Sequence, residues 1–202
     1  MKLVLASNNA HKLEELRAIL STLGMEVVSQ RDAGISIEPV EDGETFEENS
    51  YIKAKTIMDA CGLPTIADDS GLMVDALGGA PGVYSARFGG KACKSDRDRL
   101  EYLLKKMESV AEDDRDAKFV SVITMLTPDG KKIVARGECP GTILREARGE
   151  NGFGYDPVFF VREKDCTFAE LSSEEKNQIS HRARALKAFA EIVRRENKNA
   201  DK

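Results

Sequence analysis

The sequence predicts an α/β protein, and three observations support that fold class. The chain has 202 residues, which suffices for one medium α/β domain or for two small lobes around a shared cleft. Strand-like and helix-like patterns alternate from the N-terminal residues onward. Residues Phe119–Leu126 form an almost continuous apolar run, which is typical of a strand that is covered on both faces.

The first helix is predicted over His11–Leu23, because apolar side chains recur there every three or four residues. Gly24 follows directly and is expected to end this helix, as glycine commonly does. The short apolar segments on either side of it are predicted strands, at Lys2–Ala6 and Glu26–Ser29.

The second helix is predicted to begin after Thr45, which forms a T-x-x-E capping box with Glu48. It runs to about Cys61, where Gly62 and Pro64 end it.

Turn signals divide the rest of the chain into further elements. Helices are expected over Ser95–Ser109 and Ser180–Glu196, and Gly78–Gly90 is an expected loop. Residues 1–196 are expected to form a single domain, followed by a disordered tail at 197–202. Besides Phe119–Leu126, the expected strands of this part are Thr65–Ala67, Leu72–Leu77, Lys132–Arg136, Thr142–Arg148 and Pro157–Val161.

The composition restricts the possible partners. The net charge of −5 argues against a non-specific nucleic-acid binder, since such proteins carry a basic domain or stripe. It is compatible with a small polyanionic substrate, because a few cations and a metal ion can reverse the field inside one site. The sequence has no apolar stretch of about 18 residues and no secretion leader. The four cysteines never approach a C-x-x-C spacing and are typical of free thiols. We therefore expect a cytoplasmic protein without a membrane partner.

Two adjacent acids, Asp68 and Asp69, follow the predicted strand Thr65–Ala67 and precede Ser70 and Gly71. Ligands bind at the carboxyl ends of strands in open α/β sheets. Adjacent carboxylates at that edge suit a divalent metal and a water molecule to be deprotonated. An Asx-type turn between two strands is an equally good interpretation of the spacing alone.

A long acidic segment leads into the second helix. Residues 32–52 contain seven acids and no Lys or Arg. Most charge runs are solvated surface, and an acid of this segment becomes a metal ligand only if the fold brings it to Asp69. Glu41 and Asp42 are the freest to do so, because they precede Gly43 and lie outside the helix.

Helical phase turns three cations toward the interior: Lys12, Lys53 and Arg182. In contrast, Lys55 and Arg184 fall on polar helix faces. Snorkelling along the surface could explain any one inward cation, but three of them near helix starts favour a bound anion. Like charges about 4 Å apart cost on the order of 4 kcal/mol at an effective dielectric near 20. A triphosphate could therefore approach the acids only with a bridging divalent cation.

Two aromatic residues, Phe153 and Tyr155, are separated by Gly154. This pattern can present a face on which a nucleobase stacks, although a glycine-rich turn with core aromatics is the alternative. His181 and Arg182 stand at a predicted helix start, where donors favour an acceptor oxygen. A single histidine is nevertheless more often structural.

Together these motifs resemble those of the inosine/xanthosine triphosphate pyrophosphatases. They occur in the order typical of that family and span most of the chain, so the combination is specific. Ser7 stands where the family often has Thr, and it keeps the hydroxyl group. The matching segments are Ser7–Lys12, Thr45–Asn49, Ala67–Leu72, Gly79–Arg87, Phe153–Pro157 and Lys176–Arg182.

The resemblance implies an elongated mixed β-sheet flanked by helices, with two lobes around a central cleft, in a homodimer. It also implies a reaction that requires Mg²⁺. Water attacks the α-phosphorus of a nucleoside triphosphate and yields the monophosphate and pyrophosphate. The implied substrates are ITP, dITP and XTP, so the implied cellular role is to clear deaminated purine nucleotides before they enter DNA or RNA.

The resemblance also assigns roles to residues. Asp69 would be the proton acceptor and a metal ligand, assisted by Asp68 and Glu41. The residues that would hold the phosphates and the sugar are Ser7, Asn8, Asn9, Ala10, His11, Lys12, Lys53 and Ser70. The residues that would hold the base are Phe153, Gly154, Tyr155, Asp156, Lys176, His181 and Arg182.

The chemistry of the bases would explain a preference for inosine and xanthosine nucleotides over adenine nucleotides. Inosine and xanthosine carry a carbonyl group at C6, where adenine carries an amino group. Donors from His181 and Arg182 would pair with the carbonyl group but would face another donor in adenine, and unpaired buried groups give large discrimination. Guanine shares the carbonyl group, so its exclusion needs another feature, such as rejection of the 2-amino group.

Two other functions use the same residues. One is a non-catalytic nucleotide sensor, although a pure binder of polyanions gains nothing from Asp68 and Asp69. The other is a phosphomonoesterase, which would liberate orthophosphate. A P-loop NTPase or kinase is excluded, because no G-x-x-x-x-G-K-[ST] stretch occurs.

Overall fold

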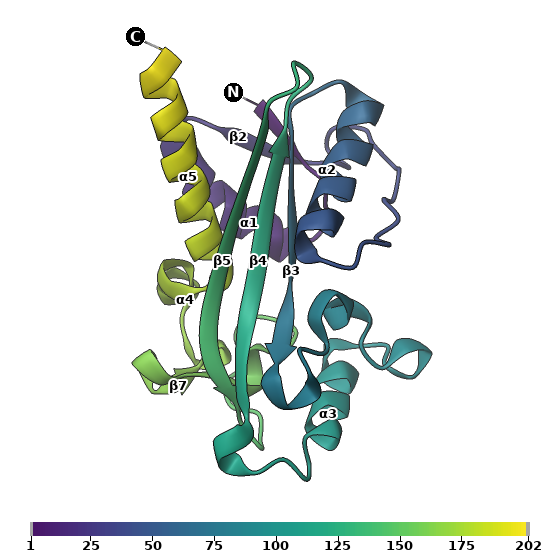
Figure 1. Cartoon of the computed structure of the whole chain (residues 1–202), viewed down its shortest axis with the longest axis vertical. Coiled ribbons are helices and arrows are strands. Elements are labelled where there is room, and N and C mark those ends of the chain that lie inside the picture. The colour runs from purple at the N-terminus through teal and green to yellow at the C-terminus, as the bar shows by residue number, and fades with distance from the viewer. Residues whose placement is uncertain (1, 201–202) are drawn as a thin grey trace. The chain divides into compact units, whose positions relative to one another are not determined.

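The computed structural model describes residues 2–200 (Figure 1). The described chain divides into two compact units. Unit 1 contains residues 2–69, Ser121–Gly137 and residues 182–200, and unit 2 contains Ser70–Val120 and Glu138–His181.

The predicted mixed sheet is confirmed. Within residues 2–200 seven strands are joined by hydrogen bonds in the order β2-β1-β3-β4-β5-β6-β7. Strand β1 runs parallel to both β2 and β3, whereas β6 runs antiparallel to both β5 and β7. The strands are β1 (Lys2–Leu5), β2 (Glu26–Ser29), β3 (Thr65–Val74), β4 (Asp116–Leu126), β5 (Lys132–Ile143), β6 (Phe159–Val161) and β7 (Cys166–Thr167).

Helices cover both faces of the strands in unit 1. Helices α1 (Ala10–Leu20) and α5 (His181–Ala200) lie on one face, and α2 (Phe46–Cys61) lies on the other (Figure 1). Side chains of a strand alternate between the two faces. In β1, for example, Leu3 packs beneath α1 and α5, whereas Val4 packs beneath α2.

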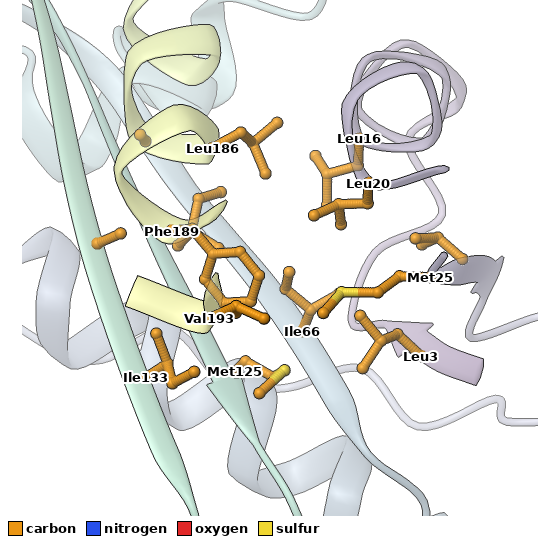
Figure 2. Packing of buried hydrophobic residues seen from close by; sticks show 14 of the residues in the cluster. Leu3, Leu16, Leu20, Met25, Ile66, Met125, Ile133, Leu186, Phe189 and Val193 are labelled. Atoms are coloured by element: carbon orange, nitrogen blue, oxygen red, sulfur yellow. The ribbon is translucent and has the colours of Figure 1, made fainter. Parts of the chain in front are cut away.

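The larger core of unit 1 lies beneath α1 and α5. Figure 2 shows Leu16 of α1 and Phe189 of α5 pointing toward the strand residues Ile66 and Met125. Both helices thus bury the apolar stripe that the spacing of their residues predicts.

Unit 2 has a separate core that is rich in aromatic rings. Phe119, Phe159 and Phe168 are in mutual contact, with ring centroids 4.6 to 5.8 Å apart. The helices of this unit are α3 (Asp96–Lys106) and α4 (Ser173–Ile179).

Helix boundaries follow the predicted capping signals closely. Thr45 and Glu48 form the expected capping box at the start of α2. Gly24 and Gly62 both adopt the left-handed conformation that ends a helix. Helix α5 continues to Ala200, beyond its predicted end at Glu196, and residues 201–202 of the predicted tail lie outside the described residues.

Two predicted strand breaks are wrong. Strand β3 is continuous over Thr65–Val74, and β5 is continuous over Lys132–Ile143. Gly141 lies inside β5 and does not interrupt it. A Cβ atom at this position would lie 2.5 Å from the Phe160 carbonyl oxygen, so glycine here permits the close approach of β6.

No helix among residues 2–200 is long and apolar enough to cross a membrane.

Candidate active site

Strand β3 sends the side chains of Asp68 and Asp69 to opposite faces of the sheet in unit 1. Ile66 packs beneath α1 and α5, whereas Ala67 packs beneath α2. Because side chains alternate along a strand, Asp68 meets residues of α1 and α5, and Asp69 meets α2. The two acids were expected beyond the end of a short strand, but they lie inside β3 and form ion pairs with different cations.

The first group surrounds Asp68, whose side chain is fully buried. Its Oδ2 lies 2.8 Å from Lys12 Nζ and 3.2 Å from Arg182 Nη2. Its Oδ1 accepts a hydrogen bond of 2.6 Å from Ser121 Oγ. Arg182 also pairs with Glu15 of α1. The inward direction predicted for Lys12 and Arg182 is therefore confirmed.

The charges of this first group stabilise one another. Burial alone would raise the pKa of Asp68, but Arg182 and Lys12 outweigh it and hold that pKa well below its usual range. Burial lowers the pKa of Lys12, although Asp68 opposes the shift. Both oxygens of Asp68 are engaged by protein donors, an arrangement suited to holding cations in place rather than to binding a metal.

The second group surrounds Asp69. Its Oδ1 lies 2.6 Å from Nζ of the buried Lys53, and that Nζ lies 3.3 Å from Glu41 Oε2. Burial raises the pKa of Asp69, although Lys53 opposes the shift. Burial would lower the pKa of Lys53, but Asp69 and Glu41 outweigh it and raise that pKa. Of the two candidate acids before α2, Glu41 joins the group of Asp69 through their shared partner Lys53.

One oxygen of this second group suits a metal ion. Asp69 Oδ2 is buried and has no hydrogen-bond partner in the described protein, and a buried acceptor without a partner is costly. Within residues 2–200 no three His, Cys, Asp or Glu side chains assemble as a metal site. Mg²⁺ needs no such cage, because it commonly takes one or two carboxylates together with water and substrate phosphates. Asp69 and Glu41 fit that donor set.

The segment predicted to hold phosphates forms the start of α1. Asn9 caps the helix by accepting the backbone N–H of Lys12 at 3.1 Å, and Ser7 Oγ accepts the N–H of Asn9 at 3.1 Å. Ala10 begins the helix, and His11 is exposed in its first turn. A helix start presents N–H groups and a partial positive charge, both of which favour a phosphate group. Asn8 precedes the helix, and its Oδ1 accepts the N–H of Arg31 at 3.3 Å.

In unit 2 the residues predicted to hold the base form a tightly bonded turn. Asp156 Oδ2 accepts the N–H of Phe153 at 2.9 Å and lies 2.7 Å from Lys176 Nζ. Lys176 Nζ also lies 4.9 Å from the centre of the Phe153 ring. Gly152 is required here, because its φ is +76° and a Cβ atom would lie 2.1 Å from Asp156 Oδ2.

The neighbours His181 and Arg182 separate at the start of α5. His181 belongs to unit 2, where it stacks on Phe119 with ring centroids 4.7 Å apart. Arg182 belongs to unit 1, where it pairs with Asp68. Successive helical residues point about 100° apart, so the start of α5 contributes one side chain to each unit. Ser70 is the first residue of unit 2, within β3.

Several polar residues with contacts in these groups were missed by the sequence analysis. Ser121 supports Asp68 from a mostly apolar part of β4, where it and Thr124 are the two hydroxyl-bearing residues of Phe119–Leu126. Asp96 Oδ2 accepts the N–H of Gly154 at 3.0 Å. The carbonyl oxygen of Ser85 accepts the hydroxyl of Tyr155 at 2.9 Å. No local pattern in the sequence marks these last two contacts.

Comparisons with known proteins agree with this arrangement of motifs. A protein of Clostridium perfringens named dITP/XTP pyrophosphatase is 48% identical, over 96% of this chain and 97% of that protein. A Haemophilus ducreyi protein of the same name is 52% identical, over 93% of this chain and 96% of that protein.

Two solved structures are also similar to this chain. The Ham1 protein of Staphylococcus aureus superposes with a TM-score of 0.87 at 41% identity, over 97% of this chain and all of that one. A Mycobacterium abscessus structure described as a nucleoside-triphosphatase and dITP/XTP pyrophosphatase has a TM-score of 0.76 at 44% identity, over 93% of this chain and 98% of that one. The sequence model of the Ham1 family matches residues 3–192. This chain therefore belongs to the Ham1 family.

Proposed function

We propose that this protein hydrolyses the triphosphates of deaminated purines, namely ITP, dITP and XTP, to the monophosphate and pyrophosphate. The observation that carries the proposal is the buried Asp69 Oδ2, which has no hydrogen-bond partner among residues 2–200 and belongs to a group that contains Glu41 and Lys53. Relatives named dITP/XTP pyrophosphatase that match nearly the whole chain support the substrate class.

Asp69 would accept the proton of the attacking water molecule. Lys53 holds Asp69 Oδ1 at 2.6 Å and so fixes the orientation of the carboxylate, leaving Oδ2 for the reaction. A new bond forms between the water oxygen and the α-phosphorus, and the bond from that phosphorus to the bridging oxygen breaks. The electron pair leaves with pyrophosphate, and the proton of the water passes to Asp69.

Asp69 and Glu41 would hold Mg²⁺, which when bound neutralises phosphate charge and acts as a Lewis acid. The start of α1, from Ser7 to Lys12, would hold phosphate oxygens through its N–H groups. Lys12 and Lys53 supply positive charge from within unit 1.

The turn of residues 152–156 and Lys176 would hold the base in unit 2. The half-exposed ring of Phe153 suits stacking, since base–aromatic stacking is worth roughly 1–3 kcal/mol. His181 would donate to the carbonyl group at C6 that adenine lacks. The structure pairs Arg182 with Asp68 and Glu15, so we assign it to holding Asp68 rather than to the base.

The test is a side-by-side rate comparison of ITP, XTP, GTP and ATP with Mg²⁺, in which the products are identified. We expect pyrophosphate as the product, with ITP and XTP turned over faster than GTP and ATP. Orthophosphate as the first product would establish a phosphomonoesterase instead. Tight binding of ITP without any product would establish a sensor.

The resemblance and the family membership also support a homodimer that acts in the cytoplasm. Sedimentation velocity of the purified chain tests the dimer, and a single monomeric species at micromolar concentration would contradict it.

A further inference from the structure

A buried serine outside the predicted site joins two segments of unit 2, one through its hydroxyl group and one through its backbone carbonyl oxygen. Ser85 lies in a 3-10 turn, Gly82–Arg87, that follows β3. The motif Gly79–Arg87 contributed to the family resemblance, but no role in the reaction has been assigned to it. The side chain of Ser85 does not face solvent, since only 7% of the residue is exposed.

Ser85 makes three hydrogen bonds in three directions. Its Oγ accepts the backbone N–H of Leu72 at 2.9 Å and donates to the carbonyl oxygen of Gly82 at 2.6 Å. Its own carbonyl oxygen accepts the hydroxyl of Tyr155 at 2.9 Å. The first bond reaches β3 and the third reaches the turn of residues 152–156.

Both of these segments matter for the proposed substrate. Leu72 is the second residue after Ser70 in β3, and its N–H donates to the Ser85 side chain. Tyr155 is buried within the turn that would hold the base. Ser85 therefore connects β3 and the base-holding turn through a single residue.

Other contacts also anchor the base-holding turn, and two of them do not involve the Tyr155 hydroxyl. Asp156 binds the N–H of Phe153, and Asp96 binds the N–H of Gly154. These bonds fix the backbone of the turn. The contact with Ser85 is the hydrogen bond that fixes the buried end of the tyrosine ring.

We propose that Ser85 is a positioning residue for base recognition, a role that rests on the proposed function. It sets the position of the Tyr155 ring, and hence of the turn that carries Phe153 and Asp156, relative to β3 within unit 2. Ser85 acts through Leu72 and Tyr155 and need not touch the substrate.

The test compares Ser85→Ala and Tyr155→Phe with the control Tyr84→Phe. Tyr155→Phe removes the hydroxyl that donates to Ser85 and keeps the ring. Tyr84 is the neighbouring tyrosine in the same turn, but it is 57% exposed, so loss of its hydroxyl leaves the network intact. Ser85→Thr restores a hydroxyl group at the buried position.

The readout is the preference for hypoxanthine over adenine, measured as the ratio of the Kd values of AMP and IMP and as the ratio of kcat/KM for ITP and ATP. We expect Ser85→Ala and Tyr155→Phe to lower both ratios about three- to tenfold, as for one hydrogen bond. Tyr84→Phe should leave them unchanged, and Ser85→Thr should recover most of the loss. A merely structural role would lower the melting temperature and leave the ratios as they are.

The outcomes separate this inference from the proposed function. Unchanged ratios in both variants would overturn the positioning role even if the wild type is fully active. If the wild type released no pyrophosphate from ITP, the hydrolysis proposal would fail, but the Kd ratio of the two monophosphates would still decide the role of Ser85. A wild type that releases no pyrophosphate from ITP and binds neither monophosphate would overturn both.

Discussion

Two neighbouring acids in β3 differ in role because a strand turns them to opposite faces. Asp68 is enclosed by Lys12, Arg182 and Ser121, and its low pKa keeps it charged. Asp69 has one oxygen on Lys53 and another that is buried without a hydrogen-bond partner in the part of the chain that the structure describes. Asp68 is suited to holding the neighbouring cations in place, and Asp69 is suited to accepting a proton or binding a metal ion.

We expect Asp69→Asn to lower kcat for ITP by about 10²–10⁴, the usual contribution of a general base. The amide can still accept a hydrogen bond from Lys53 and matches the carboxylate in shape, so the Kd for IMP should change little. Steady-state kinetics and equilibrium binding on the same preparation check this prediction. A rate within a factor of about three of the wild type would rule out Asp69 as the proton acceptor.

Asp68→Asn should destabilise unit 1 by about 3–5 kcal/mol, because it leaves buried cations without their charge partner. Urea unfolding at pH 7 measures this loss. Asp59→Asn is the control, since Asp59 pairs with Lys55 on the exposed side of α2, and its unfolding midpoint should not move.

The stabilisation by Asp68 also has a defined dependence on pH. Because the folded state lowers the pKa of Asp68, its contribution is complete above the unfolded-state value of about 3.9 and is lost as the pH falls through the folded-state value. The difference in unfolding free energy between wild type and Asp68→Asn should therefore be constant from pH 7 to 5 and shrink below about pH 4. An equal difference at pH 7 and pH 2.5 would contradict this account of Asp68.

At the scale of single elements, local signals predicted helix starts well and strand continuity badly. A capping box depends on two residues three positions apart, so Thr45 and Glu48 placed the start of α2 correctly. The same signal at Ser172 and Glu175 begins α4, a helix that the sequence analysis did not include. Gly141 lies inside β5 against β6, which is a tertiary contact that no local pattern reports.

The cap of α2 should matter for the whole group around Asp69, because α2 carries Lys53. We expect Thr45→Ala to destabilise the protein by roughly 1 kcal/mol through loss of the N-cap hydrogen bond. Thr45→Ser keeps the hydroxyl group and should restore most of that stability. Chemical denaturation of the three proteins checks the order, and equal stabilities of the Ala and Ser variants would show that the cap is not the cause.

At the scale of the whole chain, helical phase predicted which cations turn inward, but not how the candidate site residues are grouped. The inward cations Lys12, Lys53 and Arg182 followed from periodicity alone. Unit 1 is built from three separate segments of the chain and unit 2 from two. For this reason the split between His181 and Arg182, which are adjacent in sequence, could not be read from the motif that contains them both.

Removal of divalent metal should stop catalysis without unfolding the protein. Both units have apolar cores of their own, and within residues 2–200 no three metal-binding side chains come together to form a structural metal site. With EDTA we therefore expect no release of pyrophosphate from ITP, but an unchanged far-ultraviolet circular dichroism spectrum. Loss of secondary structure in EDTA would indicate a structural metal and contradict this view.

The same reasoning makes Glu41 a test of the metal site. Glu41→Gln keeps a partner for Lys53 but removes one of the two carboxylates that would hold Mg²⁺. We expect the Mg²⁺ concentration for half-maximal rate to rise about tenfold, which corresponds to ~1.4 kcal/mol of binding free energy. Glu44→Gln is the matched control, because Glu44 is an exposed acid of the same segment and should leave that concentration unchanged. If both variants behaved alike, the effect would come from the general negative charge of the segment, and Glu41 would not be a metal ligand.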